Sequence, residues 1–177
     1  GDTHVSLIDT PGHVDFSCET ERSLSVQDYC ILVVSATDGI KPHTKTLWQL
    51  LAARRIPTFI FVNKTDISDR TRDELFDEIR TVLSDKCVNF TRLGSYDFYD
   101  EAAGKDESLI EEFLDSDMLS DKTLTYAIKQ RMIFPTFFGS ALKLEGVEKL
   151  LLGIDNACRN KLGNERLICS FTVKEKS

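Results

Sequence analysis

The chain has 177 residues, of which 41% are apolar, so it can form one compact domain with a packed core and is marginal for two. Its net charge of -7 at pH 7 argues against a domain that binds nucleic acid by its own electrostatics, because neutralising phosphates requires a basic surface. The five cysteines include no Cys-x-x-Cys pair and no apolar run approaches the length of a membrane span, so we expect a cytoplasmic protein without disulfides, zinc or membrane contact.

Short apolar runs alternate with helical patterns along the chain, which predicts an α/β fold with a mostly parallel sheet flanked by helices. The runs that predict strands lie at 5–8, 31–34, 58–62 and 135–138. The patterns that predict helices lie at 42–55, 72–85 and 147–158. We expect each helix to pack an apolar stripe on the sheet. The stripe of the last helix consists of Val147, Leu150, Leu151, Ile154 and Cys158.

The segment 86–133 is interpreted as an insertion. Residues 86–106 are irregular with one short strand at most, and helical patterns follow at 108–114 and 120–132. The insertion carries the aromatic residues Phe90, Tyr96, Phe98 and Tyr99. They either cover the edge of the core, which we favour, or form a contact surface.

The last part of the chain is expected to lie apart from the domain formed by residues 1–160. A polar linker occupies 159–166, and residues 167–173 alternate like a strand. We interpret 161–177 as a linker and a candidate first strand of a following domain.

Three motifs directly follow predicted strands, and ligands of open parallel sheets bind at that edge. The first is Asp9-Thr10-Pro11-Gly12, the second is Asn63-Lys64-Thr65-Asp66, and the third is Gly139-Ser140-Ala141.

The second and third motifs have the chemistry to read guanine. A carboxylate such as that of Asp66 can accept hydrogen bonds from both N1–H and the amino group of guanine, whereas adenine would leave it unpaired. Asn63 can bridge the base and the neighbouring loop, and the stem of Lys64 can lie on the purine face. A turn of small residues allows a backbone N–H, best assigned to Ala141, to reach the guanine carbonyl. Taken alone, Asp66 would be a turn or capping residue.

The first motif has groups that suit phosphoryl transfer. Asp9 can hold a Mg²⁺-bound water, and Gly12 lets its backbone N–H approach a γ-phosphate. Loss of that phosphate would release the following segment as a switch. His13 is positioned to handle an attacking water; without the motif, it would equally be an exposed polar residue on a turn.

The amino-acid sequences of these motifs resemble those of the translational GTPases of the elongation factor G group. The likeness rests on I-D-T-P-G-H-V-D-F at 8–16, E-R-S-L-S at 21–25 and S-A-T-D-G at 35–39. Within that group, S-L-S-V at 23–26, D-G-I at 38–40, R-I-P-T-F-I-F-V-N-K at 55–64 and F-G-S-A at 138–141 are most similar to the tetracycline-resistance ribosomal protection proteins. The likeness is good over 5–66 and 134–160 and weak over 86–130.

The resemblance implies a P-loop NTPase-like, Ras-like G domain of a factor that binds GTP or GDP with Mg²⁺ and acts on the ribosome. It implies that Asp9 and Gly12 belong to the magnesium and γ-phosphate loop and that His13 positions the water. Asn63, Lys64, Asp66, Ser140 and Ala141 would read guanine.

The phosphate-loop motif Gly-x-x-x-x-Gly-Lys-[Ser/Thr] is missing from the sequence, in which Gly104-Lys105 is the only Gly-Lys pair. We therefore expect a domain truncated at its N-terminus, without the phosphate loop and first switch, that binds nucleotide weakly and is inactive by itself. In the family, the phosphate-loop strand lies between the strands that here occupy 5–8 and 31–34. We expect these to close up, to be filled by 167–173, or to drive homo-oligomer formation.

Three other interpretations remain open from the sequence. The parent could be elongation factor G itself rather than a ribosomal protection protein. The chain could be a non-catalytic GTPase-like module kept for interactions. A GTPase concerned with membranes or RNA modification is disfavoured by His13 and by the lack of a membrane-directed segment.

Overall fold

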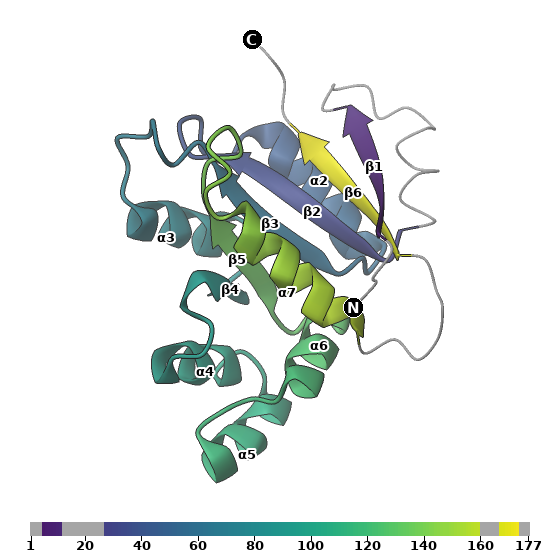
Figure 1. Cartoon of the computed structure of the whole chain (residues 1–177), viewed down its shortest axis with the longest axis vertical. Helices are drawn as coiled ribbons and strands as arrows, with labels where there is room; N and C mark the ends of the chain where they lie inside the picture. Colours follow the sequence, from purple (N-terminus) through teal and green to yellow (C-terminus); the bar gives the residue numbers. More distant parts are fainter. Residues whose placement is uncertain (1–4, 12–26, 160–166, 174–177) are drawn as a thin grey trace.

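A computed structural model describes residues 5–11, 27–159 and 167–173. Its centre is a six-stranded sheet in the order β1-β6-β2-β3-β5-β4, and every pairing between neighbouring strands in it is parallel (Figure 1). The strands are β1 (Val5–Pro11), β2 (Tyr29–Ser35), β3 (Thr58–Asn63), β4 (Cys87–Asn89), β5 (Phe134–Phe138) and β6 (Leu167–Val173). The predicted α/β class with a mostly parallel sheet is confirmed.

Helices cover both faces of the sheet. On one face lie α2 (Pro42–Ala53) and α3 (Arg72–Val82), and on the other lies α7 (Val147–Arg159), which lies in front of β3 and β5 in Figure 1. Alternation along the strands explains this arrangement, because successive side chains point to opposite faces. Phe59 and Phe61 belong to the core on the α7 side, whereas Ile60 and Val62 belong to the core on the α2 and α3 side.

The helical predictions hold with one exception. Leu47, Leu51, Leu75 and Ile79 are buried, as are Leu150, Ile154 and Cys158 of α7. Leu151 is 53% exposed, so its place in the packed stripe was predicted wrongly. It is flanked on the helix by Leu150 and Leu152, and a single helix cannot bury three consecutive side chains on one face.

The insertion contains the expected strand β4 and two expected helices, α5 (Glu107–Ser116) and α6 (Asp121–Lys129). The prediction of an irregular segment before them was wrong, because residues 96–103 form α4 (Tyr96–Ala103) after a short 3₁₀ turn at Phe90–Arg92. The hydroxyl of Ser95 accepts from the backbone N–H of Phe98 and so caps the new helix.

The aromatic residues of the insertion mainly serve the core. Phe90 and Phe98 are buried and meet edge to face with ring centroids 4.9 Å apart. Phe90 also contacts Phe137 of β5 at 5.8 Å, which joins the insertion to the central sheet. Tyr96 differs from them, because it is 58% exposed.

Strand β6 fills the position between β1 and β2. Its residues Leu167 to Val173 pair in register with Val5 to Pro11, and Ser170 also lies opposite Cys30 of β2. The segment 167–173, considered as a candidate first strand of a following domain or as a filler, therefore pairs inside this sheet. The unpaired strand edges on which we based the expectation of homo-oligomers are absent from this part of the described sheet.

No helix in the described part of the chain is long and apolar enough to cross a membrane.

Candidate functional site

The two loops with guanine-reading chemistry lie side by side. β3 ends at Asn63 and β5 ends at Phe138, and these strands are parallel neighbours in the sheet. The loops that follow them, 64–71 and 139–146, therefore leave the same edge (Figure 1). The backbone joins them directly, because Thr65 N donates to the carbonyl of Gly139 at 3.2 Å.

Asn63 links both loops through one side-chain oxygen. Its Oδ1 accepts from the backbone N–H of Lys64 and from that of Ala141, each at 2.8 Å. Its own carbonyl accepts from Ala36 N at 2.8 Å, which adds the loop after β2. Three strand ends are therefore held by one asparagine. The N–H of Ala141, which we expected to face the guanine carbonyl, donates to Asn63 in this structure.

The loop 139–146 is a closed turn that only glycine allows at two positions. Ser140 and Glu145 exchange two backbone hydrogen bonds of 3.0 Å across it. A Cβ on Gly139 would lie 2.0 Å from the carbonyl oxygen of Glu145. Gly146 has a φ of 74°, and a Cβ there would lie 2.3 Å from the carbonyl oxygen of Phe138. The close return of the chain brings residues 140–143 over the end of β3.

Asp66 is surrounded by hydrogen-bond donors from this turn. Its side chain is 10% exposed, and its Oδ2 lies 3.1 Å from Nζ of Lys143. The hydroxyl of Ser140, a residue that is 2% exposed, is hydrogen-bonded to the same carboxylate. The Ser140 hydrogen bond, followed by Lys143, lowers the pKa of Asp66 below its usual value. Asp66 is therefore a negative charge at neutral pH, held against the turn 139–146 by Ser140 and Lys143.

Two exposed side chains belong to the loops that surround this carboxylate, one in each loop. Lys64 has a left-handed backbone with φ of 65° and its side chain is exposed. Leu142 is 93% exposed, which is unusual for an apolar residue in a turn that is otherwise tied down. A lysine stem and a leucine are both suited to cover the flat face of a purine.

The loop after β2 is tied to the loop after β3 by an ion-paired glutamate. Glu78 of α3 accepts from Ile40 N at 2.9 Å and pairs with the guanidinium of Arg70. The hydroxyl of Ser68 donates to the carbonyl of Ala36 at 3.2 Å. The segment that follows Asp66 is therefore fixed on both the β2 side and the α3 side.

Neither Glu78 nor Lys143 was predicted from the sequence to belong to this site. For Glu78 no local signal was available, because its partners are 8 and 38 residues away. For Lys143 a signal existed, since a cation three residues after Ser140 lies in the turn that faces Asp66.

The first motif is only partly described. Asp9, Thr10 and Pro11 form the C-terminal end of β1, where they pair with Phe171, Thr172 and Val173 of β6. Gly12 and His13 lie outside the described residues. β6 and β2 separate β1 from β3 in the sheet, and three strand spacings place the C-terminal ends of β1 and β3 roughly 14 Å apart.

No group of three or more His, Cys, Asp or Glu side chains suited to a metal ion occurs among the residues that the structure describes.

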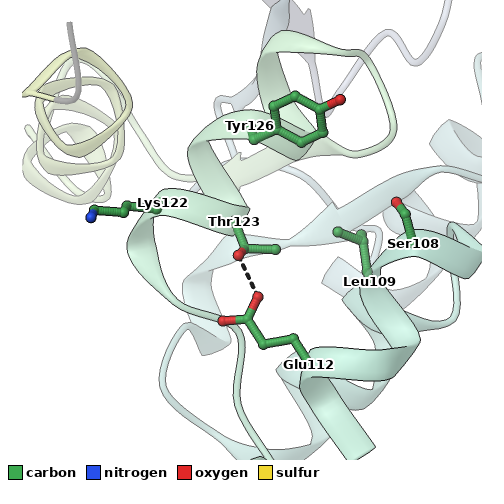
Figure 2. Close-up of a pocket in the computed structure, with 6 residues that line it drawn as sticks. All are labelled: Ser108, Leu109, Glu112, Lys122, Thr123 and Tyr126. Atoms are coloured by element: carbon green, nitrogen blue, oxygen red, sulfur yellow. Dashed lines mark hydrogen bonds between the residues drawn. The ribbon is translucent and has the colours of Figure 1, made fainter. Parts of the chain in front are cut away.

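A separate hollow of about 370 Å³ lies between α5 and α6, and none of its lining residues belongs to the three motifs. Figure 2 shows its lining, in which the carboxylate of Glu112 points to the hydroxyl of Thr123. Glu112 also accepts from Ser120 N at 2.8 Å. The glutamate thus joins the two helices, and both of its carboxylate oxygens accept hydrogen bonds within the protein.

A known protein family matches most of this chain. The family described as elongation factor Tu GTP binding domain matches residues 1–160. The chain belongs to this family. It is therefore a member of a family of GTP-binding domains, the elongation factor Tu GTP-binding domain family.

Several full-length relatives are similar to this GTP-binding domain. Tetracycline resistance protein TetP of Clostridium perfringens is 36% identical over 173 residues, covering 85% of this chain and 26% of the relative. The oxytetracycline resistance protein of Streptomyces rimosus is 34% identical over 178 residues, covering 86% of this chain and 27% of the relative. The chain thus spans about a quarter of the length of these relatives.

A solved structure supports the fold. A protein of Thermus thermophilus, determined by crystallography, superposes with a TM-score of 0.67 at 19% identity. The match covers 82% of this chain and 28% of that protein. At this level of identity, the likeness concerns the fold alone.

Proposed function

We propose that this chain is the GTP-binding and GTP-hydrolysing domain of a ribosome-associated translation factor of the tetracycline-resistance ribosomal protection type. The observation that carries the proposal is the convergence of Asn63, Asp66, Ser140 and Ala141 at one edge of the sheet, within a domain family that binds GTP. The similarity of the chain to TetP and to the oxytetracycline resistance protein supports the assignment to the ribosomal protection type over elongation factor G itself.

In this proposal, Asp66 reads the base. Its carboxylate is ionised and held by Ser140, so it can accept from N1–H and the amino group of guanine together. Adenine would desolvate the same carboxylate without pairing it, which is a strong basis for rejection. Asn63 holds the loop of Ala141 against the base, and the exposed Lys64 covers a purine face.

Asp9, Thr10, Pro11, Gly12 and His13 are proposed to form the other half of the site. The described part of this motif, the end of β1, lies at the same edge of the sheet as Asn63, which fits a nucleotide laid across the strand ends. A Mg²⁺ ion would supply charge neutralisation for the phosphates, with Asp9 holding it through water. Gly12 is proposed to contact the γ-phosphate through its N–H, and His13 to orient the attacking water.

Base recognition can be measured on the 177-residue chain itself by NMR titration with guanosine, adenosine and xanthosine. We expect guanosine to shift the amide signals of Asp66 and Ala141 and adenosine to leave them unchanged. In Asp66→Asn, the preference should move from guanosine to xanthosine by at least about tenfold, because an amide matches the xanthine edge. Asp69→Asn, which alters an exposed acid three residues later, serves as the matched control. Retained guanosine preference in Asp66→Asn would refute the role of Asp66.

Catalysis is tested on the product of the complete gene. GTP hydrolysis by that protein should rise when ribosomes are added, and His13→Ala should abolish the rise while leaving nucleotide binding intact. The 177-residue chain is expected to bind fluorescent GDP weakly and not to hydrolyse GTP, since its sequence has no phosphate-loop lysine. Nanomolar or low-micromolar GDP binding by the chain would contradict this expectation.

A second candidate is a non-catalytic interaction module of the same fold. The absence of Gly-x-x-x-x-Gly-Lys-[Ser/Thr] from the 177 residues favours it. The gene upstream of Gly1 distinguishes the two candidates, because a GTPase must encode that motif there and a non-catalytic module need not.

A further inference from the structure

We propose that Lys143 is a built-in competitor for guanine at Asp66 and thereby a residue that sets the affinity of the site for the base. The inference deepens the proposed function and rests on it, since it takes Asp66 to be the reader of the base. It assigns Lys143 to the unliganded state of the site, in which its ammonium group occupies a position that the donors of guanine must take over.

The geometry places the ammonium group on the reading carboxylate. Nζ of Lys143 lies 3.1 Å from Oδ2 of Asp66, within the range of a charge-assisted hydrogen bond. The two side chains differ in environment, because Asp66 is 10% exposed and Lys143 is 54% exposed. The carboxylate is therefore fixed and largely shielded from water, while the lysine reaches it from the solvent side and can leave without disturbing the core.

The backbone of Lys143 stays in place when its side chain leaves. Lys143 N donates to the hydroxyl oxygen of Ser140 at 3.4 Å, and the turn is closed by the two hydrogen bonds between Ser140 and Glu145. The same serine thus holds the reading carboxylate and the start of the competing side chain. The change between the two states requires only the rotation of a long, half-exposed lysine stem, which is a fast motion.

The ammonium group and guanine use the same oxygen atoms. A guanine edge presents two parallel donors to both oxygens of one carboxylate, so a guanine donor must approach the same Oδ2 that Lys143 contacts, and we take the two donors to compete for it. Without either partner, Asp66 would be a shielded charge that keeps the hydroxyl of Ser140 and its own backbone N–H but loses its charged donor, which costs free energy. The Lys143 pair removes that cost in the unliganded domain and in this way lowers the apparent affinity for every base.

Competition of this kind tunes affinity and leaves the preference among bases to Asp66. Guanine replaces the lost ion pair with two hydrogen bonds to a charged acceptor, whereas hypoxanthine supplies one donor and adenine opposes its N1 acceptor to the carboxylate. The cost of displacing Lys143 is the same for each base, so it cancels when their affinities are compared. Because the lysine is half-exposed, we expect the competition to correspond to the contribution of a solvent-screened ion pair, roughly two- to fivefold in affinity.

The experiment uses the 177-residue chain with Lys143→Met, which keeps the length of the stem and removes the charge, and Lys143→Arg, which keeps a cation. Lys149→Met, on the exposed face of α7, is the matched control. The first measurement is the titration of the Asp66 carboxyl carbon by NMR without ligand. The pKa of Asp66 should rise in Lys143→Met and stay unchanged in the control. The second is the dissociation constant for guanosine, a probe without phosphate groups, which should fall two- to fivefold in Lys143→Met and resemble the parent in Lys143→Arg.

The outcomes are distinguishable. An Asp66 titration that Lys143→Met does not move shows that the pair is absent in solution and overturns the inference. Weaker guanosine binding in Lys143→Met also overturns it, because Lys143 would then contact the ligand. If the pKa rises but neither the parent nor any variant binds guanosine, the ion pair exists and the proposed function of Asp66 fails, together with the competitor role.

Discussion

Asn63 and Ala141 lie 78 residues apart in the chain and are joined by a hydrogen bond of 2.8 Å from the Ala141 N–H to Oδ1 of Asn63. The same oxygen accepts from Lys64 N. One side chain thus sets the position of the loop after β3 and of the small-residue turn beside it. Because two strand ends depend on this atom, its removal should be felt both in stability and in recognition.

Asn63→Ala should lower the free energy of unfolding by about 1 kcal/mol, since two backbone N–H groups lose their acceptor at a partly exposed site. Urea denaturation followed by circular dichroism checks this. Asn156→Ala, an exposed asparagine of α7, should leave the midpoint unchanged. Equal midpoints for Asn63→Ala and the parent chain would show that the bridge contributes nothing to the fold.

Gly139→Ala should destabilise the chain by about 2–3 kcal/mol, because the added Cβ would lie 2.0 Å from the carbonyl oxygen of Glu145 and open the turn. Gly104→Ala is the matched control. The nearest atom to its added Cβ would be 3.5 Å away, which is an ordinary contact. Thermal melts of both variants test the difference, and a melting temperature for Gly139→Ala equal to that of Gly104→Ala would contradict the described turn.

The stability of α3 should depend on pH through Glu74. Hydrogen bonds from the backbone N–H and then the hydroxyl of Thr71 lower its pKa in the folded chain. A carboxyl group with a depressed folded-state pKa contributes stability above its unfolded value, and this contribution is lost as the pH falls through the folded value. Glu74→Gln should therefore flatten the loss of stability between about pH 5 and pH 3.

Urea midpoints measured across that pH range test the prediction for Glu74. Glu111→Gln, an exposed glutamate of α5, serves as the control and should keep the parent profile. Parallel pH profiles for Glu74→Gln and the unmodified chain would mean that the hydrogen bonds between Thr71 and Glu74 are not formed in solution.

Strand β6 should be required for a monomer. Ser170 lies in the middle of that strand, opposite Ile8 on one side and Cys30 on the other. Ser170→Pro removes a backbone donor and should expel β6, which leaves the edges of β1 and β2 free to pair with another chain. Light scattering after size exclusion should then show oligomers, whereas Ser170→Ala, which keeps the donor, should remain monomeric. A monomeric Ser170→Pro variant with protected β2 amides would favour direct closure of β1 on β2.

The strands and the long helices were predictable because their signals are local. The continuous apolar run at 58–62 indicates a buried strand, and the helical spacing of Leu75 and Ile79 indicates a helix with one buried face. The structure reproduces both. Helix α4 was missed because its eight residues are amphipathic over only two turns, with Phe98, Ala102 and Ala103 as the buried positions. Its one clear signal was Ser95, a capping residue whose hydroxyl accepts a hydrogen bond from the backbone N–H of Phe98, three positions later.

By itself, the sequence determined the α/β class and the placement of Asn63, Asp66 and Ser140 after the ends of strands, because both follow from the spacing of apolar and small residues. Only the tertiary structure decided which groups meet. The pairing of Lys143 with Asp66, the shared oxygen of Asn63 and the insertion of β6 between β1 and β2 all join residues from separate segments of the chain. Such contacts depend on how the strands are ordered in the sheet, and no local pattern encodes that order.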